Sequence, residues 1–405
     1  MLNKIENTRN HNRRHLYAGA YLSVLLLLLF ALLHFGWTKG WAAVQVAGYP
    51  PAFADMRTVQ AALASEKAGL DPMVANPADP YKRPMNYPGI WLLIAKWLAL
   101  DDESNFIAVV GMYCALYVAA TASLIWKFPS NWLLLVATSN AALMVLERGN
   151  NDIVIFLLAF VASALVSPPL IMFVIVAATG LKIYPLALVI GLRDRPGWFF
   201  TCITLLLALL IVQAADIGKL IAGTPVSTMT SFGTKSIEGM FAFNLPLKWL
   251  GRQVNWWEIL LILVLTAVCL ARRFRALIQT ACLDMEKFDA RLFVSGASIY
   301  AFTFAVGSNF DYRLIFLILC VPWLCRNNSS LPARATIICI LLAMYADLLQ
   351  RLGPVGWLVA VAAKCELFVV FTAILVHVVM SSALFRGRLA STSAMRRRAK
   401  RGSIQ

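Results

Sequence analysis

Long apolar runs separated by short polar breaks dominate the chain. The first run, Leu16 to Trp37, is long enough to cross the hydrocarbon part of a bilayer as one helix. The stretch 170–192 is too long for one span, and Gly180 to Pro185 interrupt it, so it predicts two short helices that meet at a break. Further spans are predicted near 104–126, 131–147, 152–167, 198–217, 256–271, 291–307, 313–325, 333–350 and 357–383.

This pattern predicts an all-α polytopic membrane protein with about ten to twelve transmembrane helices, depending on whether 170–192 crosses twice or is re-entrant. A long polar stretch, 38–103, is predicted as the first extracytoplasmic loop. Within it, 89–100 is apolar but too short to span, which indicates an interfacial helix. A smaller outer loop is expected at 218–255, and no internal repeat is visible.

Composition and charge agree with a membrane protein. Of 405 residues, 60% are hydrophobic and 14% charged, and the mean hydropathy is +0.73. The net charge of +16 is concentrated before the first run and after the last one, as the positive-inside rule requires when both termini are cytoplasmic. We therefore expect a bacterial inner-membrane protein that touches anionic lipid and binds no nucleic acid. Its parts are a basic N-terminus at 1–15, one membrane domain at 16–384 and a basic tail at 385–405.

Cysteine and histidine do not indicate a site. The eight cysteines lie in or beside apolar segments, and the four histidines have no metal-ligand spacing. No disulfide framework, zinc site or cofactor is predicted, although the sequence leaves a divalent metal open.

The long loop carries the first polar constellation. Asp55 lies near the first helix and is the favoured functional carboxylate, whereas Asp71 and Asp79 each precede a proline and are better explained as turn residues. Repeated prolines stiffen this loop, as a sugar site requires. The residues that could contact sugar or acceptor here are Arg57, Asp79, Arg83, Asn86 and Tyr87.

A second constellation, residues 147–152, joins two apolar runs with almost no loop. Asp152 is predicted to cap the following helix. The remaining polar residues exceed what a cap requires, and polar groups at a membrane face are costly unless they are paired or line a wet cavity. They are Glu147, Arg148, Asn150 and Asn151.

Two more constellations lie at breaks between spans. Lys182 and Tyr184 stand in the broken stretch 170–192, where an intramembrane lysine indicates function more often than simple snorkelling. Asn309, Asp311, Tyr312 and Arg313 join two later spans. Asp311 and Arg313 could pair with each other, but an arginine at the outer end of a span favours a lipid-phosphate partner.

Together, these positions predict one outer pocket in which Arg148, Lys182 and Arg313 face Asp55. Such cations could hold a leaving phosphate and offset its growing charge. The carboxylate could take the proton of an attacking hydroxyl.

The segments FADMRTVQ, GLDPMVANPADPYKRPMNYPGIW, LERGNNDIVIFLL, GLKIYPLAL and GSNFDYRLIFLILCVPWL resemble bacterial members of glycosyltransferase family 87. The resemblance runs from about residue 50 to 325. It implies a GT-C-like fold and inverting transfer from a polyprenyl-phosphate donor, without a nucleotide sugar. The resemblance does not carry over the sugar or the acceptor; we expect a hexose or pentose, with a mannose-like sugar favoured, and a lipid or glycan acceptor. It also implies that Asp55 is the catalytic base. The donor phosphate would then meet Arg148, Lys182, Tyr184 and Arg313.

Two other functions fit the composition. A transporter or flippase for a lipid-linked saccharide is the first, but it would commonly show repeats and charges at the midplane. A polysaccharide ligase or polymerase would carry its large outer loop late in the chain, whereas here the large loop comes first. A soluble nucleotide-sugar enzyme is excluded, since there is no Gly-rich phosphate loop.

Overall fold

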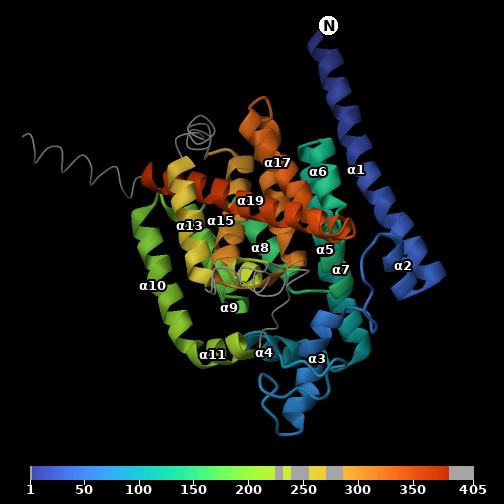
Figure 1. Cartoon of the computed structure of the whole chain (residues 1–405). Coiled ribbons are helices and arrows are strands. Elements are labelled where there is room, and N and C mark those ends of the chain that lie inside the picture. Colours follow the sequence, from blue (N-terminus) through green and yellow to red (C-terminus); the bar gives the residue numbers. More distant parts are fainter. Residues whose placement is uncertain (1, 224–230, 239–254, 271–285, 383–405) are drawn as a thin grey trace, which may run out of the picture.

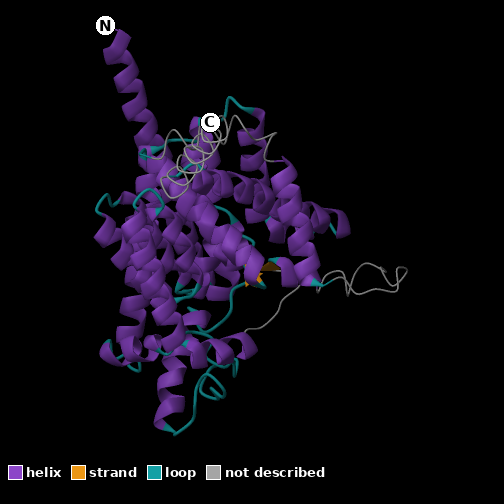
Figure 2. Cartoon of the chain, turned by 90° about the vertical axis from the view of Figure 1, so that its left-hand side faces the viewer, coloured by secondary structure: helices purple, strands orange, loops and turns teal. Residues whose placement is uncertain are grey.

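The computed structural model describes residues 2–223, 231–238, 255–270 and 286–382 (Figure 1). The predicted basic tail at 385–405 and most of the outer loop at 218–255 lie outside these residues. The described chain is mainly helical, and Figure 2 shows only one small patch of strand. The all-α prediction is thus confirmed for the described part.

The first half of the chain builds the helices around the long loop. Their bounds are α1 Leu2–Phe35, α2 Trp37–Ala43, α3 Ala54–Lys67, α4 Ile90–Trp97, α5 Glu103–Lys127, α6 Asn131–Ala137, α7 Asn140–Arg148, α8 Asp152–Ala164 and α9 Pro168–Leu181. Figure 1 shows α3, α4 and α11 together at the end of the molecule opposite the start of α1.

The second half supplies the core and its cover. Its elements are the 3-10 helix η1 Tyr184–Leu192, α10 Pro196–Val212, α11 Ala214–Gly223, β1 Ser231–Phe232, α13 Trp256–Leu270, α15 Phe288–Val306, β2 Asn309–Phe310, the 3-10 helix η3 Asp311–Cys320, α16 Val321–Arg326, α17 Leu331–Met344, α18 Ala346–Gln350 and α19 Pro354–Met380. In Figure 1, α19 runs across the view, whereas α1 and α10 run from top to bottom.

Two 3-10 helices lie at the centre of the fold. Each of η1 and η3 packs on α15, and η3 also packs on α7. Almost every side chain of η3 is buried. Gly296 of α15 allows the close approach of η3, because a Cβ there would stand 2.4 Å from the carbonyl oxygen of Phe316. This central packing holds the ends of η1, η3 and α8 side by side.

Several predicted spans are broken. The run 131–147 forms α6 and α7, because the Thr138 hydroxyl bonds back to the Leu134 carbonyl and Ser139 caps the new helix. The run 198–217 bends by 69° between α10 and α11. The runs 313–325 and 333–350 likewise divide into η3 with α16 and α17 with α18. The predicted break in 170–192 is confirmed, because α9 ends at Leu181 and η1 begins at Tyr184.

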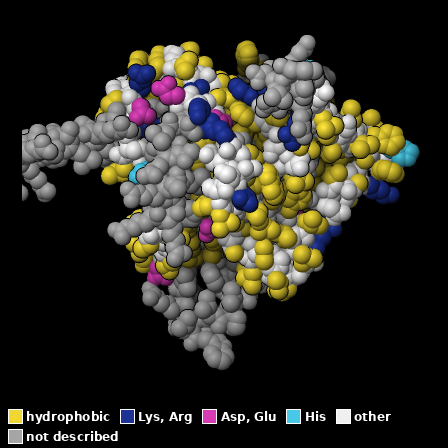
Figure 3. All heavy atoms as spheres, turned by 90° about the horizontal axis from the view of Figure 1, so that it is seen from above, with side chains coloured by type: hydrophobic (Ala, Val, Ile, Leu, Met, Phe, Trp, Pro, Cys, Tyr) yellow, Lys and Arg dark blue, Asp and Glu magenta, His cyan; other side chains and the backbone are white. Residues whose placement is uncertain are grey.

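The described helices fit a membrane protein by length and composition. Three are long and apolar enough to span a bilayer, and the bent pair of α10 and α11 could make a fourth. Shorter apolar helices of 10–17 residues are α8, α9, α13 and α17. Large apolar side chains on α1, α10 and α13 face outward, among them Leu33 at 79% and Val212 at 81% exposure. Figure 3 shows broad hydrophobic areas on the face seen from above.

Candidate functional site

Two cavities adjoin one another where α7, α8 and η3 meet the long loop. The larger, about 540 Å³, extends between η1, α10, α11 and α15. The smaller, about 450 Å³, lies under the loop and contains Asp55. Three side chains line both cavities and therefore form the wall between them: Asn86, Tyr87 and Tyr312.

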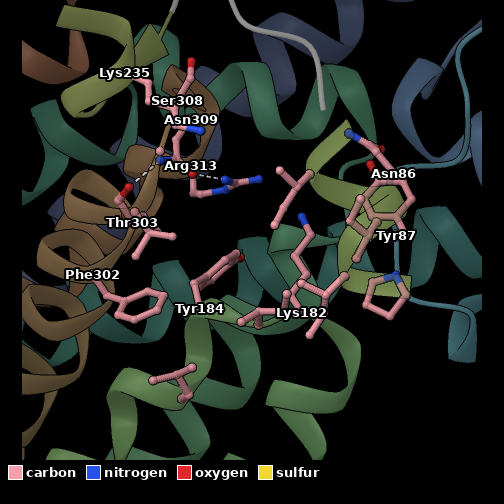
Figure 4. A pocket seen from close by; sticks show the side chains of 18 of the residues that line it. Asn86, Tyr87, Lys182, Tyr184, Lys235, Phe302, Thr303, Ser308, Asn309 and Arg313 are labelled. Atoms are coloured by element: carbon pink, nitrogen blue, oxygen red, sulfur yellow. Dashed lines mark hydrogen bonds between the residues drawn. The ribbon is translucent and has the colours of Figure 1, made fainter. Parts of the chain in front are cut away.

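The larger cavity combines cations with an apolar wall. Lys182, Lys235 and Arg313 line it together with Tyr184 and Asn309, as Figure 4 shows. Its remaining wall includes Leu186, Leu210, Ile217, Leu220, Ile221, Phe302 and Val306. Ile221 and Val306 are 67% and 58% exposed. The apolar wall therefore continues to the outer surface.

Asp152 holds the cations of this cavity in place. Its carboxylate pairs with the Lys182 ammonium and lies 3.1 Å from Nε of Arg313. The Tyr184 hydroxyl donates to the same carboxylate at 2.5 Å. Arg313 also donates to the side-chain oxygen of Asn309. Because Asp152 is fully buried, the two cations that satisfy it are fixed before any ligand binds.

Asp152 was expected to cap α8, and that prediction is wrong. The residue before α8 is Asn151, whose side chain makes no cap hydrogen bond. Instead, the Asn150 side-chain oxygen accepts from the Asp152 backbone N–H at 2.8 Å. This turn frees the Asp152 carboxylate to face Lys182 and Arg313.

Asn150 connects the two cavities. Its side-chain nitrogen donates to Oδ2 of Asp55 at 2.7 Å and lies 3.5 Å from the Tyr87 hydroxyl. Its side-chain oxygen accepts from Lys182 at 3.3 Å as well as from the backbone of Asp152. Asn150 is fully buried and all its polar atoms have partners, so it fixes Asp55 relative to the cations.

A close backbone approach makes this bridge possible. Gly149 ends α7 with φ +54°, and a Cβ there would stand 2.7 Å from Cβ of Phe53. Phe53 itself has φ +64° and precedes α3. The Tyr113 hydroxyl stabilises this turn by donating a hydrogen bond to the Gly149 carbonyl at 2.5 Å. Only glycine fits such a position, and it places Asn150 beside the start of α3.

Asp55 lies in the first turn of α3 and is oriented from two sides. Oδ1 of Asp55 is 3.1 Å from Arg83, which also donates to the Ala54 carbonyl at 2.5 Å. Asp79 holds the Arg83 guanidinium through both of its oxygens and accepts from Thr58 at 3.1 Å. Each carboxylate oxygen of Asp55 makes one hydrogen bond within the described chain, which leaves lone pairs for a further donor.

The long loop is tied to the bundle beside the dividing wall. The Gly89 N–H donates to Asp216 of α11 at 3.1 Å. The Trp91 indole donates to the Leu181 carbonyl at 2.9 Å. These bonds fix the loop before and after its entry into α4, and hence the segment that carries Asn86 and Tyr87.

Arg148 lies in the smaller cavity and not beside Lys182 and Arg313. Its guanidinium stacks 3.9 Å above the Tyr49 ring and pairs with Glu147 at 3.1 Å. Glu147 is buried and accepts from the Tyr49 backbone at 2.7 Å and the Trp37 indole at 3.2 Å. The prediction of one pocket with three cations is therefore corrected to two adjoining cavities, with Arg148 on the side of Asp55.

Other predicted contacts point away from the cavities. Arg57 forms a two-bond pair with Glu103 at 2.7 Å and stacks on Phe106, because it lies on a different face of α3 from Asp55. Asp79 is buried behind Arg83 as a turn residue, accepting from the Tyr81 backbone. Neither side chain lines either of the two cavities. The prediction that Arg57 and Asp79 contact sugar or acceptor is therefore corrected, and both residues instead position the loop.

Asp311 is also displaced from the predicted site. Its carboxylate pairs with Lys364 of α19 at 2.7 Å, and Lys364 further donates to the Ser231 carbonyl at 3.2 Å. The alternative pairing of Asp311 with Arg313 is therefore wrong, because successive side chains of η3 point in different directions.

Asn151, from the predicted constellation at residues 147–152, is buried, and its amide has no hydrogen-bond partner in the described part of the chain.

Lys235 is a cavity residue that the sequence did not indicate. The two-stranded sheet pairs Phe232 with Asn309, and the Ser236 and Ser308 hydroxyls lie 2.8 Å apart. These contacts bring Lys235 to the same cavity as Lys182 although it belongs to the predicted outer loop. Within the described residues it forms no ion pair. Sequence spacing could not show this, since the sheet joins segments about seventy residues apart.

The sequence analysis did not select Asp347 and Lys364 either. Here a signal was present, because both are charged residues inside apolar runs, a pattern that by itself indicates a functional or paired position. Lys364 pairs with Asp311, whereas Asp347 lines the smaller cavity.

Comparison with family models, curated proteins and solved structures finds no match to this chain. Among the described residues, no group of three or more His, Cys, Asp or Glu side chains could hold a metal ion.

Proposed function

We propose that this protein is a membrane glycosyltransferase that moves a sugar from a polyprenyl-phosphate donor to an acceptor hydroxyl. The observation that supports this most directly is the pair of adjoining cavities. One presents cations and an apolar wall, the other presents Asp55, and three side chains belong to both.

The larger cavity suits the donor. A phosphate with a hydrocarbon chain needs cations beside an apolar channel, and Lys182, Lys235 and Arg313 lie next to a wall that reaches the exposed Ile221 and Val306. Asp152 neutralises part of the charge of Lys182 and Arg313 and fixes their positions. Preorganised cations of this kind stabilise the charge that grows on a leaving phosphate.

The smaller cavity suits the acceptor. Its hydroxyl oxygen would attack the anomeric carbon of the sugar at the wall of Asn86, Tyr87 and Tyr312. The bond from that carbon to the phosphate oxygen breaks, and the polyprenyl phosphate leaves with the bonding electrons. Asp55 takes the proton of the hydroxyl, and attack from the side opposite the phosphate inverts the anomeric centre. A mannose-like hexose remains the favoured sugar, with a pentose as the alternative.

The proposal includes a bacterial inner-membrane location with about ten to twelve crossings, both termini in the cytoplasm and the two cavities on the extracytoplasmic side. Reporter fusions after Pro80 and after Arg195 test this arrangement. The first should report outside and the second inside. The reverse orientation would contradict it, because the lipid-linked donor would then be on the wrong side.

The activity is tested with purified full-length protein in nanodiscs and a panel of radiolabelled polyprenyl-phosphate sugars. Wild type should release polyprenyl phosphate and form a glycoside, and Asp55→Asn should lower the rate by about a hundredfold or more. Asp101→Asn is the matched control, since that carboxylate pairs with Lys67 at the exposed surface. Movement of an intact lipid-linked saccharide between leaflets, without bond cleavage, would support a flippase instead.

A further inference from the structure

Asp347 lies in the cavity of Asp55, and its carboxylate has no partner among the residues that the structure describes. It lies on the short helix α18 and lines the smaller cavity. Its Oδ1 atom is buried and accepts no hydrogen bond, and the carboxylate forms no ion pair with any described residue. A polar atom buried in this way is costly unless a ligand or water satisfies it.

The other charged groups of the smaller cavity are already engaged. Arg83 is held by Asp55 and Asp79, and Arg148 is held by Glu147 and the Tyr49 ring. Each Asp55 oxygen also accepts one hydrogen bond, so among the charged side chains that line this cavity Asp347 is the one that no described side chain engages. In the larger cavity the corresponding group is a cation, Lys235.

This difference indicates what each cavity can bind. Two carboxylates, Asp55 and Asp347, and two guanidiniums, Arg83 and Arg148, line the smaller cavity, so their formal charges cancel. An unpaired carboxylate accepts hydrogen bonds from hydroxyl groups and repels an anion. The rings of Phe310 and Tyr312, stacked with centroids 5.7 Å apart, add aromatic surface to the same cavity.

We propose that Asp347 binds hydroxyl groups of the acceptor and that the acceptor is a neutral saccharide. The inference rests on the proposed function, because it assigns the smaller cavity to the acceptor. Asp347 then determines acceptor specificity, whereas Asp55 takes the proton. An anionic acceptor such as a uronic acid or a lipid phosphate is disfavoured by the Asp347 carboxylate, which has no cation partner among the described residues.

Binding can be measured without turnover by saturation-transfer NMR on the full-length protein in nanodiscs. The probes are two methyl glycosides of the same hexose series: the neutral hexoside and the uronic acid. Wild type should bind the neutral hexoside more tightly than the uronic acid. Asp347→Asn should raise its Kd by about tenfold, the loss expected for hydrogen bonds to a charged group.

Two further variants keep the test decisive. Asp347→Ser removes the charge with a smaller side chain and should weaken binding in the same way, while Asp347→Glu should retain part of it. Asp101→Asn is the control and should bind as wild type does. Unchanged binding of the neutral hexoside by both Asp347→Asn and Asp347→Ser would overturn the proposal. Tighter wild-type binding of the uronic acid than of the neutral hexoside would also overturn it.

Failure here can be told apart from failure of the proposed function. If Asp55→Asn abolishes release of polyprenyl phosphate while the Asp347 variants bind glycosides normally, the transferase stands and only the role of Asp347 falls. If Asp55→Asn leaves that release unchanged, the proposed function itself is contradicted.

Discussion

The side-chain amide of Asn150 donates a 2.7 Å hydrogen bond to Oδ2 of Asp55. The two residues are 95 positions apart, and the contact joins the start of α3 to the turn between α7 and α8. Because the other end of the same amide accepts from Lys182, the position of the carboxylate is set relative to the cations of the larger cavity.

The first prediction concerns this bridge. Asn150→Ala should lower the rate of sugar transfer by about ten- to a hundredfold, because Asp55 loses one of its two orienting partners and Lys182 loses an acceptor. Asn105→Ala, at an exposed position of α5, is the control. Rates are measured as release of polyprenyl phosphate in nanodiscs. Equal rates for wild type and Asn150→Ala would remove the bridge from the mechanism.

The second prediction concerns the buried carboxylate of the larger cavity. Asp152→Asn should destabilise the protein by about 3–5 kcal/mol, since Lys182 and Arg313 would lose their shared buried counter-charge. Added polyprenyl phosphate should stabilise this variant more than wild type, because the lipid phosphate replaces the missing anion. Thermal unfolding in detergent, with and without the lipid, measures both effects. Equal stabilisation of both proteins would mean that the phosphate does not bind these cations.

The third prediction concerns Lys235. Lys235→Gln should raise the Kd for polyprenyl phosphate by about tenfold, because a charge-assisted contact to the phosphate is lost. The control is Lys96→Gln, which affects a surface pair with Glu66 at 2.8 Å and lies on α4 outside the larger cavity. Binding is followed by displacement of a fluorescent polyprenyl-phosphate analogue. An unchanged Kd for Lys235→Gln would exclude it from the phosphate site.

The fourth prediction uses the pH dependence of the long loop. Burial raises the pKa of Asp79, but its hydrogen bonds and ion pair with Arg83 outweigh this effect and hold the pKa below the ordinary value. The stabilisation is therefore complete above the unfolded pKa of about 4 and is lost as the pH falls through the lower folded pKa. The gap in melting temperature between wild type and Asp79→Asn should be largest near neutral pH and shrink below about pH 4. A gap independent of pH would contradict this role of Asp79.

The fifth prediction concerns the close approach beside Asp55. Gly149→Ala should destabilise the fold and lower transfer, because a Cβ at φ +54° would press on Phe53 and separate Asn150 from α3. Gly191→Ala is the control, since a Cβ at Gly191 meets no heavy atom within 4 Å. Melting temperature and transfer rate are measured for both. A stable, active Gly149→Ala protein would show that this approach is not required.

Apolar periodicity was sufficient to predict the helical class and the break after Leu181, because both follow from local composition. It did not predict that the run 131–147 divides at Ser139 or that α10 bends into α11. Those breaks depend on hydroxyl groups that bond to nearby carbonyls and on packing against distant segments. Long apolar runs in a sequence therefore overstate the length of single helices.

The candidate site was predictable in part. The motifs around Asn150, Lys182 and Arg313 lie where the two cavities meet, as their polar character beside apolar runs indicated, and Asp55 of the polar loop joins them there. The directions of neighbouring side chains were not predictable, because Asp311 and Arg313 are two residues apart and join different ion pairs.

The wall of Asn86, Tyr87 and Tyr312 has a thermodynamic consequence. Since these three side chains belong to both cavities, a ligand that moves any of them on one side reshapes the space on the other. Occupancy of the two sides is then linked, and the factor by which one ligand changes the affinity of its neighbour must be the same in either order of addition.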